Sequence, residues 1–131
     1  MAGLRAAHRR HYNKWIDQLK AEGCKALGYR LTGDIVDRLC VRHLRANIRV
    51  IVAFETPELA WILLIGPHDN SDPGIDIYTI IYQALDTPIP SEKRIKPPCC
   101  DGTDQLPPGW GDHIDELIDS IVAFTRSRRR R

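Results

Sequence analysis

The sequence predicts an α+β fold, with a small antiparallel β-meander packed against an N-terminal helix and C-terminal helices. Three apolar runs between residues 39 and 65 are joined by short polar turns, and two of them alternate with the period of a strand. The segments on either side repeat their apolar residues every three or four positions instead, as helices do. A chain of 131 residues with 43% hydrophobic and 27% charged residues fits one globular domain.

The first predicted element is an amphipathic helix over residues 4–22. Its apolar stripe consists of Leu4, Ala7, His11, Trp15 and Leu19, widened by Tyr12 and Ile16. Gly23 follows where a helix commonly ends on a left-handed residue. Residues 24–38 predict an extended connection that includes either a short strand or a second helical turn.

The meander comes next. In the first strand, Leu39 and Val41 alternate with Cys40, and a turn is expected at Ala46–Asn47. The second strand alternates over residues 48–54, and a polar turn over residues 55–58 leads to a third strand. This third run, Leu59–Ile65, is continuously apolar, which predicts a strand buried on both faces.

Two further helices are expected after the meander. Asp72 followed by Pro73 is a typical helix start, and a helix to Leu85 is predicted there, with a fourth strand beginning near Ile75 as the alternative. Residues 86–111 hold six of the nine prolines and predict a linker or surface loop. Asp112 then begins a last helix, and residues 126–131 are expected to trail off as an arginine-rich tail. Residues 1–85 thus form the α+β domain, and residues 86–131 pack on the same domain.

Charge is distributed unevenly along the chain. Residues 1–50 hold 11 Lys and Arg against 4 Asp and Glu, residues 51–125 hold 3 against 13, and residues 126–131 add 5 Arg, for a net charge of +2. Such a division is typical of a nucleic-acid-facing half beside a half that faces elsewhere. Two differently charged solvated surfaces are the alternative interpretation.

The four cysteines are Cys24, Cys40, Cys99 and Cys100. Two adjacent cysteines, no CxxC pair and few cysteines for the length favour reduced thiols in a cytoplasm over a disulfide framework. The spacing matches no common zinc signature, and neither a P-loop nor a dinucleotide fingerprint is present. We therefore expect no metal and no small-molecule cofactor. No apolar run approaches the roughly 18 residues of a transmembrane helix, which predicts a soluble, cytoplasmic protein without a membrane partner.

Several side chains are candidates for chemistry. A sheet face carrying arginines can hold a phosphate backbone and stabilise charge at a scissile phosphate, although a solvated face with ion pairs is the alternative. His68 follows the third strand and can act as a general acid or base oriented by Asp69, unless Asp69 only caps the turn. Tyr78 and Tyr82 can stack on a base or carry a proton, or simply belong to the core. The candidate nucleic-acid-binding residues are Arg9, Arg10, Arg38, Arg42, Arg45 and Arg49.

The stretch R-L-C-V-R-H-L-R-A-N-I-R-V-I-V-A-F over residues 38–54 resembles the core of the RelE/ParE-type bacterial toxins. In that superfamily a helical region precedes a strand with R-x-L/V-R, a tight turn and a second strand with x-Y/I-R-V-x-Y/F. The resemblance extends over roughly residues 4–85, where His68 falls at the family's H-R/D/K position. The chain departs from the family in lacking an N-terminal strand before the helix and in carrying residues 86–131.

The resemblance implies a curved antiparallel sheet against helices and one of two toxic activities. RelE-like members cleave mRNA on the ribosome without a metal, and the residues matching their catalytic positions are Arg42, Arg45, Arg49, His68 and Tyr78. The leading hypothesis is therefore a toxin of this kind, with a cognate antitoxin protein, mRNA and the ribosome as partners. The alternatives are a non-catalytic binder, such as a DNA gyrase inhibitor or accessory protein, and an interaction domain whose arginine tail docks on nucleic acid.

Overall fold

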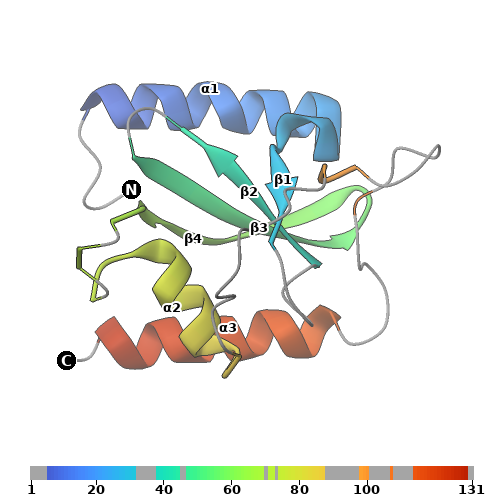
Figure 1. Cartoon of the computed structure of the whole chain (residues 1–131). Coiled ribbons are helices and arrows are strands. Elements are labelled where there is room, and N and C mark those ends of the chain that lie inside the picture. Colours follow the sequence, from blue (N-terminus) through green and yellow to red (C-terminus); the bar gives the residue numbers. More distant parts are fainter. Residues whose placement is uncertain are drawn as a thin grey trace.

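A four-stranded antiparallel sheet lies between one helix on one face and two helices on the other (Figure 1). The computed structural model describes residues 6–31, 38–44, 47–69, 71–72, 74–87, 98–100, 107 and 114–129. Its elements are α1 (Ala6–Glu22), the 3-10 helix η1 (Gly23–Ala26), β1 (Tyr29–Arg30), β2 (Leu39–His43), β3 (Ile48–Thr56), β4 (Leu59–Pro67), α2 (Ile77–Ala84) and α3 (Ile114–Arg129). The predicted α+β class is confirmed. None of the helices in this described part is long and apolar enough to cross a membrane.

The strands follow one another in the order β1-β2-β3-β4, so the predicted meander is present and gains a short first strand. In the pairing of β2 with β3, Val41 lies opposite Ile51 and His43 opposite Arg49. The alternation predicted for β2 and β3 is confirmed, because Leu39, Val41 and Ile51 pack on one side and Cys40, Val50 and Val52 on the other.

The expectation that the third predicted strand is buried on both faces is wrong. β4 is the last strand in the sheet order, and its residues are half-buried or exposed. Leu59 and Trp61 are 47% and 44% exposed. A continuous apolar run is therefore compatible with a strand whose faces are only partly covered.

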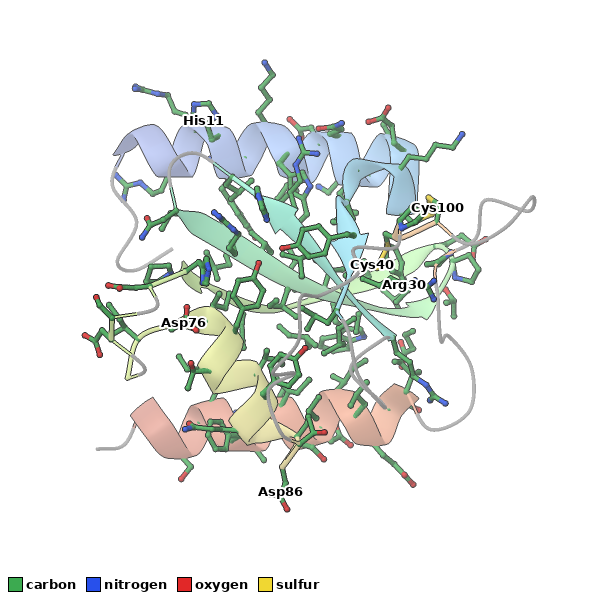
Figure 2. All side chains as sticks on the ribbon, in the orientation of Figure 1. His11, Arg30, Cys40, Asp76, Asp86 and Cys100 are labelled. Carbon is green, nitrogen blue, oxygen red and sulfur yellow. A yellow bond between two sulfur atoms is a disulfide. The ribbon has the colours of Figure 1, made fainter. Side chains whose placement is uncertain are left out.

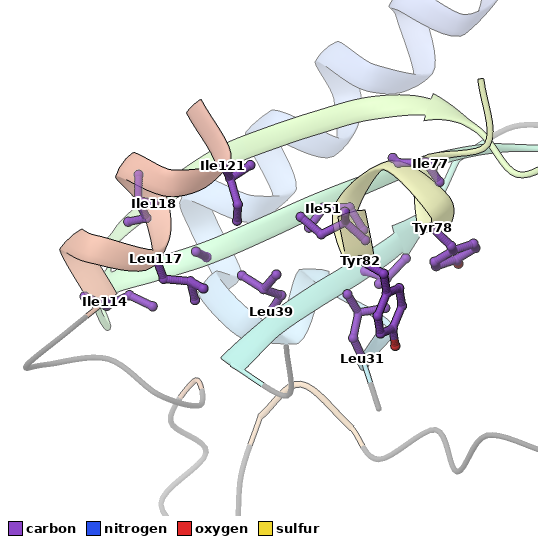
Figure 3. Packing of buried hydrophobic residues seen from close by; sticks show 13 residues of the cluster. Leu31, Leu39, Ile51, Ile77, Tyr78, Tyr82, Ile114, Leu117, Ile118 and Ile121 are labelled. Carbon is purple, nitrogen blue, oxygen red and sulfur yellow. The ribbon is translucent and has the colours of Figure 1, made fainter. Parts of the chain in front are cut away.

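Two apolar cores lie on opposite faces of the sheet. α1 covers one core through Tyr12 and Trp15, and the other core joins the sheet to α2 and α3. Figure 3 shows this second core, in which Ile114, Leu117, Ile118 and Ile121 point from α3 toward the sheet and α2. Burying the stripe of α3 is a stabilising contribution of about 1.5–3 kcal/mol for each fully buried Leu or Ile side chain.

The ends of the helices differ in part from the prediction. Gly23 has a φ of +61°, as expected for a residue that ends a helix, and both η1 and β1 occur in the segment where a helical turn or a strand was expected. α2 begins later than predicted, since its N-cap is Asp76 and not Asp72, and no strand forms over the described residues around Ile75. α3 continues to Arg129, so the arginines up to that point belong to a helix and not to a trailing tail.

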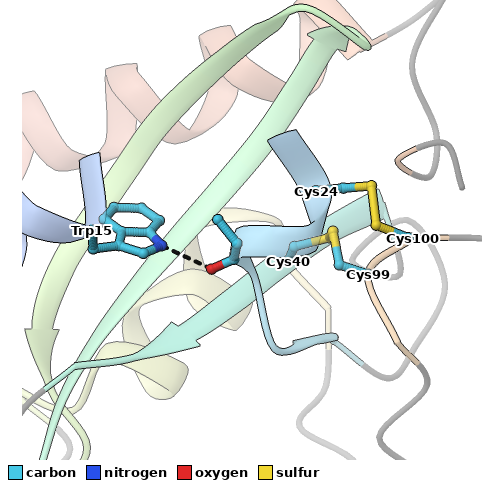
Figure 4. Close-up of a disulfide and its surroundings, with 6 residues drawn as sticks. Trp15, Cys24, Cys40, Cys99 and Cys100 are labelled. Carbon is cyan, nitrogen blue, oxygen red and sulfur yellow. Dashed lines mark hydrogen bonds between the residues drawn. A yellow bond between two sulfur atoms is a disulfide. The ribbon is translucent and has the colours of Figure 1, made fainter. Parts of the chain in front are cut away.

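All four cysteines are paired, which contradicts the prediction of reduced thiols. Cys24 of η1 bonds to Cys100 and Cys40 of β2 bonds to Cys99, with Cα–Cα separations of 5.4 and 5.7 Å (Figure 4). The two adjacent cysteines reach two different elements, so they need not bond to each other. Pro98 beside them forms an antiparallel bridge with Tyr29 of β1. A segment near residue 100 is thereby attached to the start of the sheet.

Several predicted features lie outside the described residues. These are Leu4, Arg45, Ala46, Pro73, Asp112 and most of the proline-rich segment over residues 86–111.

Candidate functional site

Polar side chains from four elements meet at one end of the sheet. Because β2 and β3 form a hairpin, the last residue of β2, His43, lies opposite Arg49 near the start of β3. On the other side of Arg49, β4 places Gly66, which has no side chain. The alternation of the strands points His43 and Arg49 to the face that carries α2.

The N-terminus of α2 holds the histidine that follows β4. The Nδ1 atom of His68 lies 2.9 Å from Oδ1 of Asp76, and the same oxygen accepts the backbone N–H of Asp69 at 2.8 Å. The other carboxylate oxygen of Asp76 accepts from Thr79 twice, from its backbone N–H at 3.0 Å and from its hydroxyl at 2.9 Å. Figure 2 shows Asp76 at the start of α2, beside this end of the sheet.

The carboxylate of Asp76 is therefore both a helix cap and the partner of a histidine. Its side chain is 6% exposed, and burial alone raises its pKa. The hydrogen bonds from His68, Asp69 and Thr79 outweigh that effect and hold the pKa below its ordinary value. Because an ionised carboxylate only accepts hydrogen bonds, Nδ1 of His68 donates, and in the neutral ring Nε2 is left as the basic nitrogen.

A pair of tyrosines lies between the two histidines. The hydroxyl groups of Tyr29 and Tyr78 are 2.7 Å apart, and the Tyr29 hydroxyl is 3.0 Å from Nε2 of His43. The ring of Tyr78 lies edge-on to the ring of His68, with centroids 4.7 Å apart at 83°. The chain of contacts thus runs from Asp76 through His68 and both tyrosines to His43.

Tyr78 keeps its proton at neutral pH. Burial raises the pKa of its hydroxyl strongly, the hydrogen bond with Tyr29 raises it further, and the nearby Arg49 guanidinium only partly opposes them. A phenol of this kind can donate a hydrogen bond but does not act as a base near pH 7. We call Tyr29, His43, Arg49, His68, Asp76 and Tyr78 the His–Tyr cluster.

The structure brings together three of the five residues predicted to be catalytic. Arg49, His68 and Tyr78 all lie in the His–Tyr cluster. Arg42 belongs to the other side of β2, where it borders a hollow below α1. Arg45 lies outside the described residues. A single arginine-bearing sheet face therefore cannot hold both residues, because Arg42 pairs with Val50 and Arg49 with His43, which places Arg42 and Arg49 on opposite faces.

The remaining predicted nucleic-acid-binding residues are spread over the molecule. Arg9 and Arg10 are exposed on α1. Arg38 borders a separate hollow between α2 and α3, where Asp86 and Glu116 lie nearby. These acidic neighbours make the surroundings of Arg38 a poor match for a phosphate.

Sequence reasoning missed three members of the cluster. Of the two roles left open for Asp69, the turn cap is confirmed, because its carboxylate accepts from the backbone and hydroxyl of Ser71, at 3.0 and 2.6 Å. Asp76 orients His68 instead, and the spacing D-x-x-T of a helix cap at Asp76 and Thr79 was the available signal. Tyr29 and His43 carry no such local signal, because they meet only when β1 pairs with β2.

A metal site requires several ligand side chains that lie close together. Within the described ranges, no group of three or more His, Cys, Asp or Glu side chains is arranged to hold a metal ion.

Comparisons with known proteins add no relative. No protein-family model, no curated protein and no solved structure matches the chain significantly. The resemblance to RelE/ParE toxins therefore stays a prediction from the sequence, and the function has to be argued from the site.

Proposed function

We propose that this chain is a toxin of the RelE/ParE kind that cleaves RNA by metal-independent acid–base catalysis. The observation that supports the proposal is the pairing of two histidines with an arginine at one end of the sheet. In the proposed reaction the 2′-hydroxyl of a nucleotide attacks the adjacent phosphodiester. This reaction uses a base, an acid and a cation, and the site offers the basic nitrogen of His68, a second histidine and an arginine for these roles.

The proposed reaction assigns one role to each group. Nε2 of His68 takes the proton from the 2′-hydroxyl, while Asp76 holds the ring and stabilises its positive charge. The 2′-oxygen forms a bond to phosphorus, and the bond from phosphorus to the 5′-oxygen of the next nucleotide breaks. Protonated His43 gives its proton to that oxygen. The products are a 2′,3′-cyclic phosphate and a 5′-hydroxyl.

Arg49 and the tyrosines complete the site. Arg49 pairs with His43 across the β2–β3 hairpin, and its guanidinium can hold two phosphate oxygens while charge develops on them. Tyr29 and Tyr78 are positioning residues, because their hydroxyls contact each other and the Tyr29 hydroxyl also contacts His43. Both histidines, by contrast, are at least partly exposed to solvent, as substrate access requires.

The proposed partners are mRNA on the ribosome and a cognate antitoxin, and the proposed location is the cytoplasm. The two disulfides are the feature that a cytoplasmic location does not account for, since reducing compartments keep thiols unpaired. The activity is therefore best measured on the oxidised and the reduced protein in parallel.

The experiment incubates purified protein with translating ribosomes and end-labelled mRNA and maps the new RNA ends. We expect fragments with 2′,3′-cyclic phosphates, and a loss of about 100-fold or more in cleavage rate for His68→Gln and for His43→Gln. Tyr82→Phe is the matched control, because it removes a buried hydroxyl from α2 outside the cluster and should cleave normally. Absence of cleavage by the wild type, together with arrest of growth when it is expressed, would instead favour the non-catalytic binder.

A further inference from the structure

A second surface, on the opposite side of the sheet from α2, has the features of an anion site. α1 overhangs the end of β2 there and leaves a hollow of about 590 Å³. We call this the α1 hollow, and its lining residues are His11, Lys14, Trp15, Gln18, Arg42, His43 and Leu44. Its volume lies within the roughly 300–1,000 Å³ of ordinary ligand pockets.

The helical spacing of α1 places three of the residues that line the hollow on the same side of the helix. His11, Lys14 and Gln18 are three and four residues apart, so they lie along one side of the helix above the strand. Figure 2 shows His11 on α1 at the end where the hollow lies. The helix is held in place over the sheet by buried Trp15, whose Nε1 donates to the carbonyl oxygen of Ala26 at 2.9 Å (Figure 4).

The charge of the hollow is positive. Lys14 and Arg42 both border it, and none of its lining residues is acidic. Over the described residues, neither of these two cations takes part in an ion pair or a hydrogen bond through its side chain. Arg38, by comparison, lies beside two carboxylates in its own hollow. Two cations that border one hollow with no acidic lining residue favour an anionic ligand there.

The α1 hollow adjoins the His–Tyr cluster through a single residue. His43 lines the hollow and also forms the hydrogen bond with Tyr29. It lies at the end of β2, beyond the two residue pairs that join β1 to β2, so β1 does not separate the two surfaces there. A polymer bound at the cluster can therefore continue past His43 into the hollow.

We infer that the α1 hollow binds a phosphate group of the same single-stranded RNA whose neighbouring phosphodiester lies at Arg49 and His43. Lys14 and Arg42 contact the phosphate oxygens, while the apolar side chains of Trp15 and Leu44 bound the other part of the hollow. This inference rests on the proposed function, and it names the path of the substrate beyond the reacting bond.

The test measures binding separately from cleavage. A fluorescein-labelled oligonucleotide with 2′-deoxy sugars cannot undergo the proposed reaction, so its anisotropy reports binding alone. Each single-strand phosphate that the protein neutralises contributes about 0.7 to the magnitude of the slope of log K against log salt. Because Lys14 and Arg42 hold one phosphate group, Lys14→Gln with Arg42→Gln should lower that magnitude by about 0.7. The matched control is Lys20→Gln with Lys25→Gln, which removes two exposed charges from the same end of the chain outside the hollow. The control should leave the slope unchanged.

Each result decides one question. The inference is overturned if the two double variants reduce the slope equally, which would indicate net charge only, or if neither reduces it. If the oligonucleotide binds through the hollow while the wild type never cleaves RNA, the α1 hollow stands and the proposed function fails.

Discussion

Replacing Asp76 by Asn tests whether one carboxylate organises the end of the sheet. The side chain keeps its size, and the single oxygen of the asparagine amide can still cap α2 by accepting the backbone N–H of Thr79. The other carboxylate oxygen, which accepts from His68 at 2.9 Å and from the backbone N–H of Asp69 at 2.8 Å, becomes an NH₂ group. The NH₂ group of the asparagine then faces two other donors, Nδ1–H of His68 and the backbone N–H of Asp69.

The expected cost follows from the number of bonds lost. Each hydrogen bond to a charged group contributes about 1.5–3 kcal/mol, and two of them are removed from a side chain that is 6% exposed. Relief from burying a charge offsets part of this loss, since burial by itself raises the pKa of Asp76. We expect Asp76→Asn to lower the free energy of unfolding by about 3 kcal/mol at pH 7.

The same reasoning gives a pH dependence with a defined sign. The pKa of Asp76 in the folded protein lies below its value of about 3.9 in the unfolded chain. Its contribution to stability is therefore fully present above that unfolded pKa and is lost as the pH falls through the lower folded pKa. Protonated Asp76, like the asparagine side chain of the variant, has only one oxygen that is purely an acceptor, so the difference in stability between wild type and variant should narrow as the pH falls below the unfolded pKa of about 3.9.

Urea unfolding followed by circular dichroism at pH 7, 5 and 2.5 measures this difference. Asp72→Asn is the matched control, because Asp72 is an exposed carboxylate in the same loop that accepts the Gly74 backbone N–H at 3.1 Å. Its effect should stay within about 0.5 kcal/mol. A gap between wild type and Asp76→Asn that is as large at pH 2.5 as at pH 7 would refute the role assigned to the carboxylate.

Three further predictions concern other parts of the molecule. The disulfides join residues that are 76 and 59 positions apart, so either crosslink alone stabilises the folded protein by about 4 kcal/mol in the chain-entropy treatment. The urea midpoint of unfolding should therefore fall when a phosphine reductant is added, and an unchanged midpoint would contradict the pairing. Gly23→Ala should cost about 1 kcal/mol in thermal unfolding, and only through its backbone, because φ is +61° and nothing lies within 4 Å of an added Cβ. Tyr29→Phe should lower the raised pKa of Tyr78 in an ultraviolet titration, since burial remains but the Tyr29 hydroxyl is gone; an identical titration would show that the two hydroxyls do not interact.

The order and the faces of the strands were predictable because they depend on local geometry. Alternating side chains belong to opposite faces of a strand, so the sequence placed Leu39 and Val41 in one core and Cys40 in the other. The spacing of the stripe on α3 likewise predicted that this helix packs against the domain. The exposure of β4 was not predictable, because the run Leu59–Ile65 does not reveal that no described strand pairs with its outer edge.

The candidate site was predicted only in part. His68 and Tyr78 were identified from their residue types and their positions after a strand and on a helix. Arg49 was identified with them, but it was grouped with Arg42, from which the sheet separates it.

The sequence offered only Asp69 as a partner for His68, whereas the carboxylate that holds its ring is Asp76, eight residues away. The cysteines were predicted to be reduced because their spacing matched no disulfide framework, and spacing does not show that Cys99 and Cys100 lie beside Cys40 and Cys24 in the fold.

Hydrophobic period and turn chemistry act over a few residues, so the α+β class, the meander, the helical stripes and the chemical types available for a reaction follow from the sequence. Which of those groups meet depends on the tertiary structure. Tyr29 reaches Tyr78 across 49 positions, and Cys24 reaches Cys100 across 76. Contacts of that separation depend on strand register and helix packing, which set distances that no local pattern contains.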